Sequence, residues 1–293
     1  MGAAIKAGLL ALVCALACGI VGAAPVVLVD TAHQQHRFDH PPERIASLLP
    51  ALTETICKLG ECSHLVVVDR YSNWPASVAR LPKAGGLEDI DVEQIVAARP
   101  DVVLLGNEPR VEERLQSLGL VVFELETETY ADIGRNVSVL GAMLGVPQRA
   151  ARLNGQIGHS VAAVAAATRA RLSGHAPRVY FEVDPAPYGA GPQSFMGQML
   201  GRVGALNILP ASLGPFPRLN PEYIVRANPD VILVSAADAS QLPHRPGWDR
   251  IRAVRQNRIC TFPPDVRDTI VRPGPRVAEG FEALSRCLLR AVP

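Results

Sequence analysis

One phrase of thirteen residues is written almost identically in two places of this chain: EQIVAARPDVVLL begins at Glu93 and EYIVRANPDVILV begins at Glu222. Each copy is typical of a short helix that ends at Pro100 or Pro229 and leads into a strand. The strand residues are apolar throughout instead of alternating with polar ones, as expected for a parallel sheet that is covered on both faces. The repeat therefore predicts two similar α/β units within one chain.

Strands alternate with helices of about ten residues in both halves of the chain. In the first half the predicted elements are RIASLLP (strand), ALTETICKLG (helix), HLVVVD (strand), VEQIVAARP (helix), DVVLL (strand), VEERLQSLG (helix) and LVVFEL (strand). In the second half they are RVYFEVD (strand), FMGQMLGRVG and PEYIVRANP (helices), DVILVSA (strand), WDRIRAVRQN (helix), RICTFP (strand) and a last helix from about Pro275 to Leu289. The predicted fold class is α/β, with two Rossmann-like lobes that each contain a central parallel sheet.

A segment rich in alanine and arginine lies between the two halves, from Pro147 to Gly174. Proline suits the first turn of a helix and glycine suits the position after its end, so one long helix is predicted here. At about 1.5 Å per residue, roughly 25 residues would span about 40 Å. The predicted organisation is an N-terminal lobe at 24–146, a connecting helix at 147–174 and a C-terminal lobe at 175–293. A single rigid connector predicts little hinge closure.

The first residues predict export. In MGAAIKAGLLALVCALACGIVGAAPVV an apolar run follows Lys6 and ends in small residues, and VGA fits the specificity of signal peptidase. Residues 1–23 are therefore predicted to be a signal peptide that is cleaved near Ala23, and not a membrane span. The alternative is a lipid anchor on Cys18, although the preceding ALA lacks the usual leucine three residues ahead.

Four cysteines lie beyond the signal segment, and an even count in an exported chain indicates two disulfides. Cys57 and Cys62, in CKLGEC, are near enough in sequence to close a small loop, which leaves Cys260 to pair with Cys287. Three connectivities are open, and the clustering favours this one. A zinc site is the alternative, but neither pair has the close spacing that is usual for zinc ligands.

Other function classes find little support. The net charge is +1 and no basic block is present, so partners of the nucleic-acid class are not expected. GHSVA at 158–162 differs from the G-x-S-x-G nucleophile elbow in its last residue and lies in an alanine-rich helix. The loose group of His33, His36 and His40 favours a solvated strand or turn over adventitious metal binding. No enzyme activity, cofactor or metal site is predicted, and a secreted α/β enzyme is the alternative from another class.

Five segments match one known family in its own order: RIASLLPALTETICKLG, VVVDRYSNWP, VEQIVAARPDVVLL, PEYIVRANPDVILV and RPGPRVAEGFEAL. From about Arg44 to Leu289 the chain resembles the periplasmic substrate-binding proteins of ABC importers for cobalamin and iron-siderophores, in particular the cobalamin-binding members. The resemblance implies two lobes joined by a rigid helix, with the ligand in the cleft between them. It implies a periplasmic monomer that captures a metal chelate, in the first place cobalamin or another corrinoid, and delivers it to a permease dimer.

The same resemblance gives the two glutamates of the repeat a role. In this family each lobe presents a surface glutamate to arginines on the membrane permease, and Glu93 and Glu222 fall on those two positions. The phrase would then occur twice because the permease has two halves. From the residues alone, a carboxylate at a helix start is favoured by the helix dipole, so a local capping role is the alternative.

By the same resemblance, loops at the carboxyl ends of strands line the cleft. The predicted ligand-binding residues are Tyr71, Trp74, Leu87, Asn107, Tyr188, Ser194, Phe216, Asp265 and Arg267. Trp74 could equally plug a buried loop, and Tyr71 could be a core residue with a satisfied hydroxyl.

The chain departs from its cobalamin-binding relatives in the cleft. Those relatives line it with several tryptophans, whereas the matching positions here are Leu87, Gly106 and Phe216, and only Tyr71 keeps the matching aromatic residue. Corrinoid precursors, ferric siderophores and haem therefore stay open as ligands. Ferric catecholates would need several arginines in the cleft, for which Arg267, Arg272 and Arg110 are the candidates.

Overall fold

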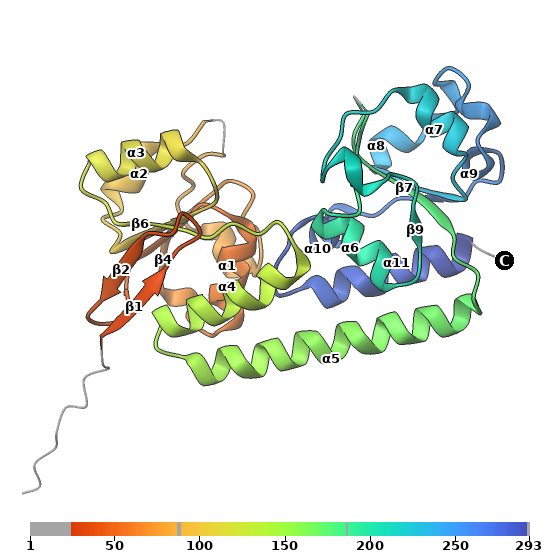
Figure 1. Ribbon diagram of the computed structural model, residues 1–293. Helices are drawn as coiled ribbons and strands as arrows, with labels where there is room; N and C mark the ends of the chain where they lie inside the picture. The colour runs from red at the N-terminus through yellow and green to blue at the C-terminus, as the bar shows by residue number, and fades with distance from the viewer. Residues whose placement is uncertain (1–24, 87–88, 186, 292–293) are drawn as a thin grey trace, which may run out of the picture.

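The structure, a computed structural model, describes residues 25–86, 89–185 and 187–291. The predictions for the signal segment 1–23, for Cys18 and for Leu87 concern residues outside these ranges. Two α/β lobes stand side by side on a base of long helices (Figure 1), which confirms the predicted fold class. Among the described residues, no helix combines the length and the apolar character needed to cross a membrane.

The N-terminal lobe is built on a four-stranded sheet in the order β4-β3-β5-β6, and all its strands are parallel. The strands are β3 (Ile45–Ser47), β4 (Leu65–Val68), β5 (Val102–Leu105) and β6 (Val122–Glu124). The helices are α1 (Pro50–Lys58), α2 (Val92–Ala97), α3 (Pro109–Ser117) and α4 (Tyr130–Met143), with 3-10 turns η1 (Cys62–His64) and η2 (Ala76–Arg80).

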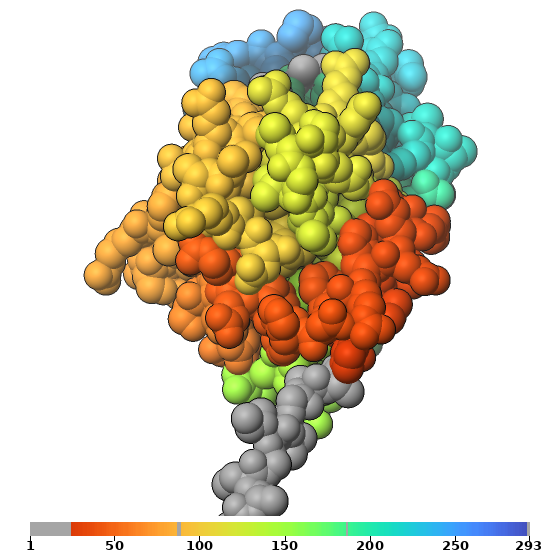
Figure 2. All heavy atoms as spheres, turned by 90° about the vertical axis from the view of Figure 1, so that its left-hand side faces the viewer, coloured from red at the N-terminus to blue at the C-terminus, as the bar shows by residue number. Residues whose placement is uncertain are grey.

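A short antiparallel hairpin precedes this sheet, formed by β1 (Val26–Val29) and β2 (Gln35–Phe38). Figure 2 shows the hairpin on the outer end of the N-terminal lobe. The histidine-rich segment that the sequence placed in a strand or turn lies here. His36 is held at 2.8 Å from the buried carboxylate of Asp30.

The C-terminal lobe has a five-stranded sheet centred on β7 (Arg178–Asp184). The strands β9 (Leu206–Asn207), β10 (Val231–Leu233) and β11 (Ile259–Cys260) belong to its parallel part, and β8 (Tyr188–Gly189) adds one antiparallel strand beside β7. The helices are α6 (Phe195–Arg202), α7 (Pro221–Ala227), α8 (Ala236–Ala239), α9 (Arg252–Arg255), α10 (Pro264–Val271) and α11 (Val277–Ala291), with 3-10 turns η3 (Ala211–Leu213), η4 (Leu242–His244) and η5 (Trp248–Arg250).

One helix prediction in this lobe was wrong. WDRIRAVRQN forms two short pieces, η5 and α9, instead of a single helix. Ile251 between them is extended (φ −64°, ψ 132°), and its side chain is 1% exposed. Burying this side chain in the core interrupts the helix.

The predicted connector is the helix α5 (Pro147–Leu172), which runs beneath both lobes (Figure 1). It packs against α4 of the N-terminal lobe and against α11 of the C-terminal lobe. Ile157 and Val161 on its buried face belong to one hydrophobic cluster that also includes Leu140 of α4 and Phe281 of α11. Because a single core continues under both lobes, the base joins them through packed side chains as well as through the chain itself.

The repeated phrase has the same local structure in both lobes. Arg99 and Asn228, which precede the prolines, both have a left-handed backbone with φ of 44° and 46°. The N–H of Asp101 donates to the carbonyl of Arg44 at 2.7 Å, and its carboxylate accepts the N–H of Arg44 at 2.8 Å. Asp230 makes the same two bonds with Arg178, at 2.8 and 2.9 Å. In each lobe the aspartate after the proline thus bonds the start of one strand to the start of its neighbour, β5 to β3 and β10 to β7.

Both predicted disulfides are confirmed. Cys57 is bonded to Cys62 across five positions, at the end of α1, and Cys260 of β11 is bonded to Cys287 of α11 across 27 positions. The zinc alternative was therefore wrong, because a zinc site needs these sulfurs as free thiolates.

Candidate ligand-binding cleft

The lobes meet around a cavity of about 530 Å3. One wall is the segment 126–129, which follows β6 of the N-terminal lobe, and the others come from the C-terminal lobe. The lining residues are Glu126, Thr127, Glu128, Thr129, Gln193, Phe195, Met196, Pro215, Phe216, Val271 and Pro273. Phe216 is 47% exposed, so its ring is available to a molecule in the cavity.

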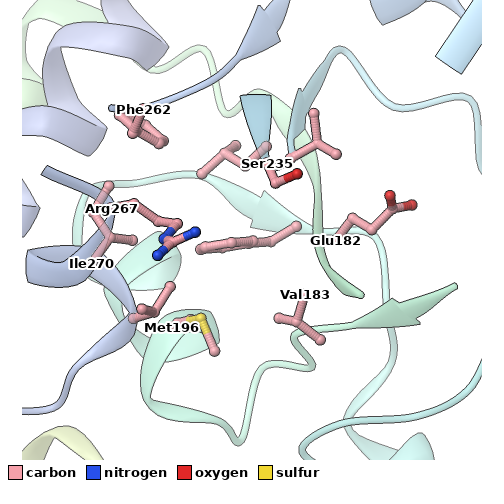
Figure 3. A pocket seen from close by; sticks show the side chains of 11 residues that line it. Glu182, Val183, Met196, Ser235, Phe262, Arg267 and Ile270 are labelled. Carbon is pink, nitrogen blue, oxygen red and sulfur yellow. The ribbon is translucent and has the colours of Figure 1, made fainter. Parts of the chain in front are cut away.

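A second cavity, of about 320 Å3, lies in the C-terminal lobe (Figure 3). Its lining residues are Phe181, Glu182, Val183, Met196, Leu233, Val234, Ser235, Phe262, Arg267, Ile270 and Val271. Its walls include the carboxyl ends of β7 and β10, which is where open α/β sheets bind ligands. Met196 and Val271 also line the first cavity, so the two hollows adjoin.

The charged residues that line this second cavity differ in how strongly they are paired with other side chains. Glu182 is 4% exposed, and its carboxylate accepts two hydrogen bonds from Arg245, at 2.6 and 2.9 Å. Burial lowers the pKa of Arg245, but the Glu182 carboxylate outweighs it and raises the pKa above its ordinary value. Arg267 has a weaker partner, Asp268 at 3.4 Å, and its guanidinium points into the cavity (Figure 3). Arg267 is therefore the cation that this cavity offers to a ligand.

The N-terminal side of the cleft is acidic. A cavity of about 390 Å3 is lined by Thr31, Asn107, Glu124, Glu126, Glu128, Thr129, Asp132 and Arg135. The N–H of Asn107 donates to the Glu126 carboxylate at 2.8 Å. Burial raises the pKa of Asp132, but hydrogen bonds from Thr129 and the charge of Arg135 bring it below its ordinary value. The N-terminal wall is thus anionic, whereas the C-terminal wall is mainly apolar.

Three of the predicted ligand residues, Asn107, Phe216 and Arg267, line these cavities. Tyr71 is 58% exposed and follows β4. Trp74 is half-buried. The cationic groups of Lys58 and Arg276 each lie over the ring of Trp74, at 5.0 Å from its centre. Trp74 is thus a packed loop residue at the junction of the lobes, and contact of Tyr71 or Trp74 with a ligand stays a prediction.

The other described candidates lie in three different settings. Ser194 is fully buried, and its hydroxyl accepts the N–H of Gly197 and donates to the carbonyl of Gly191, so it caps α6. Tyr188 is half-buried on the edge strand β8, and Asp265 is exposed in the first turn of α10. Contact of these three residues with a ligand stays a prediction.

The remaining candidate arginines lie elsewhere. Arg272 is engaged in ion pairs with Glu54 at 3.1 Å and with Asp268 at 2.6 Å. Arg110 lines a separate cavity of about 480 Å3 beside α2 and α3, together with Glu93. Of the three arginines, the structure thus directs Arg267 toward the cleft cavities.

Glu93 and Glu222 occupy matching places in the two lobes. Each is exposed in the first turn of its helix, Glu93 in α2 and Glu222 in α7. Both helices lie on the side of the molecule opposite the connecting helix (Figure 1). Glu222 has Arg226 at 3.9 Å, a pair whose side chains are 79% and 71% exposed. Since such a pair is weak, both carboxylates remain accessible.

The sequence analysis missed most of the apolar lining, above all Phe181, Met196 and Phe262. A signal was present, because Phe181 lies in the strand RVYFEVD near its carboxyl end, the end at which ligands bind. Met196 and Phe262 come from a helix start and a loop, and their approach to this strand depends on the tertiary fold.

Comparison with known proteins decides the family. The profile of the family described as periplasmic binding protein matches residues 45–266. The chain belongs to the periplasmic binding protein family. The resemblance found in the sequence is thus confirmed, and the match covers both lobes and the connecting helix.

The relatives and solved structures similar to this periplasmic binding protein are named as binding proteins, one of them of an ABC transporter. An uncharacterized ABC transporter substrate-binding lipoprotein of Bacillus subtilis is 26% identical over 273 residues, which cover 90% of this chain and 85% of that protein. A cobalamin-binding protein of Halobacterium salinarum is 30% identical over 220 residues, covering 73% of this chain and 59% of that protein. A crystal structure of a periplasmic heme-binding protein from Pseudomonas aeruginosa shares 27% identity with a TM-score of 0.77, and covers 86% of this chain and 94% of that one.

This periplasmic binding protein is therefore the substrate-binding component of an ABC transporter of the cobalamin, haem and siderophore type. It is a binding protein and not an enzyme, as expected, and the alternative of a secreted enzyme is set aside. One relative is named a lipoprotein, and the similar structure from Pseudomonas aeruginosa is named periplasmic.

Proposed function

We propose that this protein captures a corrinoid, cobalamin or a precursor, in the cleft between its lobes and delivers it to the permease. The observation that carries the proposal is the pair of adjoining cavities, of about 530 and 320 Å3. Phe216, which is 47% exposed, lines the first cavity, Phe181 lines the second, and Met196 lines both. A flat macrocycle needs apolar and aromatic walls with a few polar groups at the rim. Relatives named cobalamin-binding, at 30% identity, support the same ligand class.

Haem is the second candidate, and one observation favours it. Tyr71 is 58% exposed, and its hydroxyl has no hydrogen-bond partner among the described residues. A tyrosine oxygen is one of the axial ligands by which proteins hold haem iron. A solved structure with 27% identity is named heme-binding. Arg267 would then supply a cation for a carboxylate at the edge of the macrocycle.

A parallel titration separates the two ligands. The mature protein is titrated with cyanocobalamin and with hemin, together with the variants Phe216→Ala and Tyr71→Phe. If the ligand is a corrinoid, cyanocobalamin should bind saturably with one-to-one stoichiometry. Phe216→Ala should weaken this binding about tenfold, which corresponds to a loss of about 1.4 kcal/mol of binding free energy. Tyr71→Phe should hardly change it. Haem binding predicts an iron–phenolate absorption band that Tyr71→Phe abolishes. Failure of both ligands to bind would contradict both candidates.

We further propose that Glu93 and Glu222 dock the two lobes on the two halves of a permease dimer, with this protein acting as a monomer. Their matching, exposed positions on one side of the molecule support this role. Complementary charges at such an interface chiefly set orientation and association rate. The double variant Glu93→Ala/Glu222→Ala is expected to lose stimulation of transport while its ligand affinity stays unchanged. Glu282→Ala, on α11, is the matched control, and a double variant that stimulates like wild type would rule out docking through these residues.

The same proposal includes a periplasmic location after cleavage of 1–23, with lobes at 24–146 and 175–293 and the connecting helix at 147–174. A lipid anchor on Cys18 is the alternative, and one relative is named a lipoprotein. Mass spectrometry of the exported protein decides between them, since cleavage near Ala23 and acylation of Cys18 give different N-terminal peptides.

A further inference from the structure

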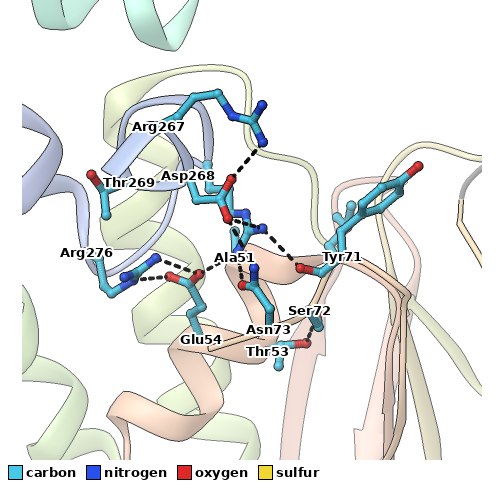
Figure 4. Close-up of polar contacts among 12 residues, drawn as sticks. Ala51, Thr53, Glu54, Tyr71, Ser72, Asn73, Arg267, Asp268, Thr269 and Arg276 are labelled. Atoms are coloured by element: carbon cyan, nitrogen blue, oxygen red, sulfur yellow. Dashed lines mark hydrogen bonds and ion pairs between the residues drawn. The ribbon is translucent and has the colours of Figure 1, made fainter. Parts of the chain in front are cut away.

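The segment that follows the last strand of the C-terminal lobe returns to the N-terminal lobe. Arg272 and Arg276, in the turn between α10 and α11, both donate to Glu54 of α1. Figure 4 shows Arg276 facing Glu54. Arg276 donates to Glu54 at 2.9 and 3.3 Å, and Arg272 donates at 3.1 Å. Glu54 is 2% exposed. A carboxylate of one lobe and two guanidiniums that follow the other therefore form a buried bridge at the junction.

Arg272 makes more contacts than this bridge requires. Beyond Glu54, its guanidinium lies 2.6 Å from the carboxylate of Asp268 and donates to the side-chain carbonyl of Asn73 at 2.8 Å. It also donates to the main-chain carbonyl of Tyr71 at 3.0 Å. Only a planar fork with several donors can satisfy so many acceptors at once, which a lysine cannot do. Two of these four acceptors belong to the loop that carries Tyr71.

That loop is fixed on its other side by the N-terminal lobe itself. The carboxylate of Asp69 accepts the N–H groups of Tyr71 at 2.7 Å and of Ser72 at 3.1 Å. Lys83 donates to the carbonyl of Ser72 at 2.6 Å. The main chain at Tyr71 is thus held by Asp69 through its N–H and by Arg272 through its carbonyl, while the residue stays 58% exposed. The ring can contact a ligand, and its place is set from both lobes.

The cluster is also balanced in charge. Two buried carboxylates, Glu54 and Asp268, face the guanidiniums of Arg272 and Arg276. At the exposed rim Arg267 pairs with Asp268 at 3.4 Å and Glu279 with Arg276 at 3.7 Å, so the charges stay balanced. Removing one member of a buried set leaves the others uncompensated, so such a cluster tolerates little change in geometry. We call this cluster the clamp. It fixes the position of the two lobes relative to each other more than it adds to the free energy of unfolding.

We propose that Arg272 is a positioning residue of the ligand cleft, which holds the Tyr71 loop of the N-terminal lobe in a fixed place relative to the C-terminal lobe. The inference rests on the proposed function, with Tyr71 contacting the ligand through its ring if the ligand is a corrinoid and through its oxygen if it is haem. The guanidinium of Arg272 bonds to protein groups and not to the ligand, so it acts on the ligand through Tyr71. The cleft is then preformed, and the bound molecule does not have to order this wall.

Trp74 offers a test of the clamp that needs no ligand. Its ring lies in the same loop, beside Arg276, whereas Trp248, the other tryptophan of the chain, is fully buried. Quenching of tryptophan fluorescence by acrylamide therefore reports mainly on Trp74. Arg272→Met, which keeps the apolar stem, is expected to raise the quenching constant about twofold through local loosening. Arg286→Met, the same change at an exposed arginine of α11, is expected to leave it unchanged.

Ligand binding tests the action through Tyr71. Arg272→Met is expected to weaken binding of cyanocobalamin or hemin, whichever the wild type binds, about tenfold, mainly through faster dissociation. Arg272→Lys, which keeps the charge but loses the fork, is expected to lie in between, and it serves as the folded variant if Arg272→Met does not fold. In a Tyr71→Ala background, Arg272→Met is expected to have no further effect, because residues that act through one another are not additive.

Two results would overturn the inference: quenching of Trp74 that is unchanged in Arg272→Met, or a double variant in which the two losses of affinity simply add. If the wild type binds neither probe, the proposed function fails, and the quenching comparison still decides whether Arg272 holds the loop.

Discussion

The repeated phrase makes the same main-chain hydrogen bonds between strands in both lobes, but the side chains around these bonds differ. In the C-terminal copy, Asp230 is 7% exposed and also pairs with Arg252, whereas in the N-terminal copy Asp101 is exposed. The left-handed position before the proline holds Asn228 in one copy and Arg99 in the other. Asparagine tolerates this conformation better than arginine. The main-chain bonds between strands are thus shared, and because Asp230 is buried and paired with Arg252, we expect the C-terminal copy to depend more on its aspartate.

The walls that the lobes present to the cleft differ even more. The N-terminal wall carries Glu126 and Glu128, while the C-terminal wall offers Phe181, Met196 and the cation of Arg267. A shared scaffold therefore carries two unlike surfaces, as expected for a ligand that is apolar on one side and polar on another. The comparison predicts that equivalent substitutions in the lobes have unequal effects.

The largest difference is expected for the disulfides. Cys260 and Cys287 close a loop of 27 positions, and Cys57 and Cys62 close one of five. By loop entropy, the double variant Cys260→Ala/Cys287→Ala should lose about 3.5 kcal/mol of unfolding free energy, and Cys57→Ala/Cys62→Ala about 2 kcal/mol. Urea unfolding of both double variants checks this. Equal losses would mean that the loops do not govern the effect.

The next difference concerns the two aspartates of the repeat. Asp230→Ala removes a buried acceptor and leaves Arg252 without its ion pair, so it should cost about 2.5 kcal/mol of unfolding free energy. Asp101→Ala removes an acceptor that water can replace, and should cost about 1 kcal/mol. The two variants are each other's control in urea unfolding. If Asp101→Ala proved the more costly, the ranking of the two copies would be wrong.

Asp230 should also leave a signature in the pH dependence of stability. Burial raises its pKa, but the N–H of Arg178 and the guanidinium of Arg252 outweigh burial and lower the pKa below its ordinary value of 3.8. A lowered pKa in the folded state contributes stability that is present above the unfolded pKa and is lost as the pH falls through the folded one. Unfolding midpoints measured from pH 5 downward should therefore fall less steeply in Asp230→Asn than in wild type. Parallel curves would contradict this linkage.

The smallest difference is expected at the left-handed positions. Arg99→Asn should gain about 0.5 kcal/mol of unfolding free energy, because it relieves an unfavourable φ without removing a main-chain bond. The reverse change, Asn228→Arg, should lose a similar amount. Thermal unfolding of the pair measures both, and changes of the same sign would show that backbone strain does not decide them.

The features that the sequence predicted correctly are those that depend on residues close together in the chain. The repeated phrase predicted α2, β5, α7 and β10, and the spacing of the cysteines predicted both disulfides. Pro147 and Gly174 predicted the two ends of α5. The break at Ile251 was missed because core packing, and not helix periodicity, sets its backbone. The bridge between Glu54 and Arg276 joins residues 222 positions apart, and no local signal marks such a pair. Met196 and Phe262 of the cavity lining were missed for the same reason, whereas Phe181 had a local signal in its place near the carboxyl end of its strand.

Hydrogen exchange of the full mature chain, with and without saturating cyanocobalamin or hemin, tests most directly that the ligand is held between the lobes. The account predicts that ligand protects main-chain amides on both sides of the cleft: 69–75 and 126–129 in the N-terminal lobe, and 193–196 and 214–216 in the C-terminal lobe. Protection confined to one lobe, or spread over α5 and α11 alone, would contradict it.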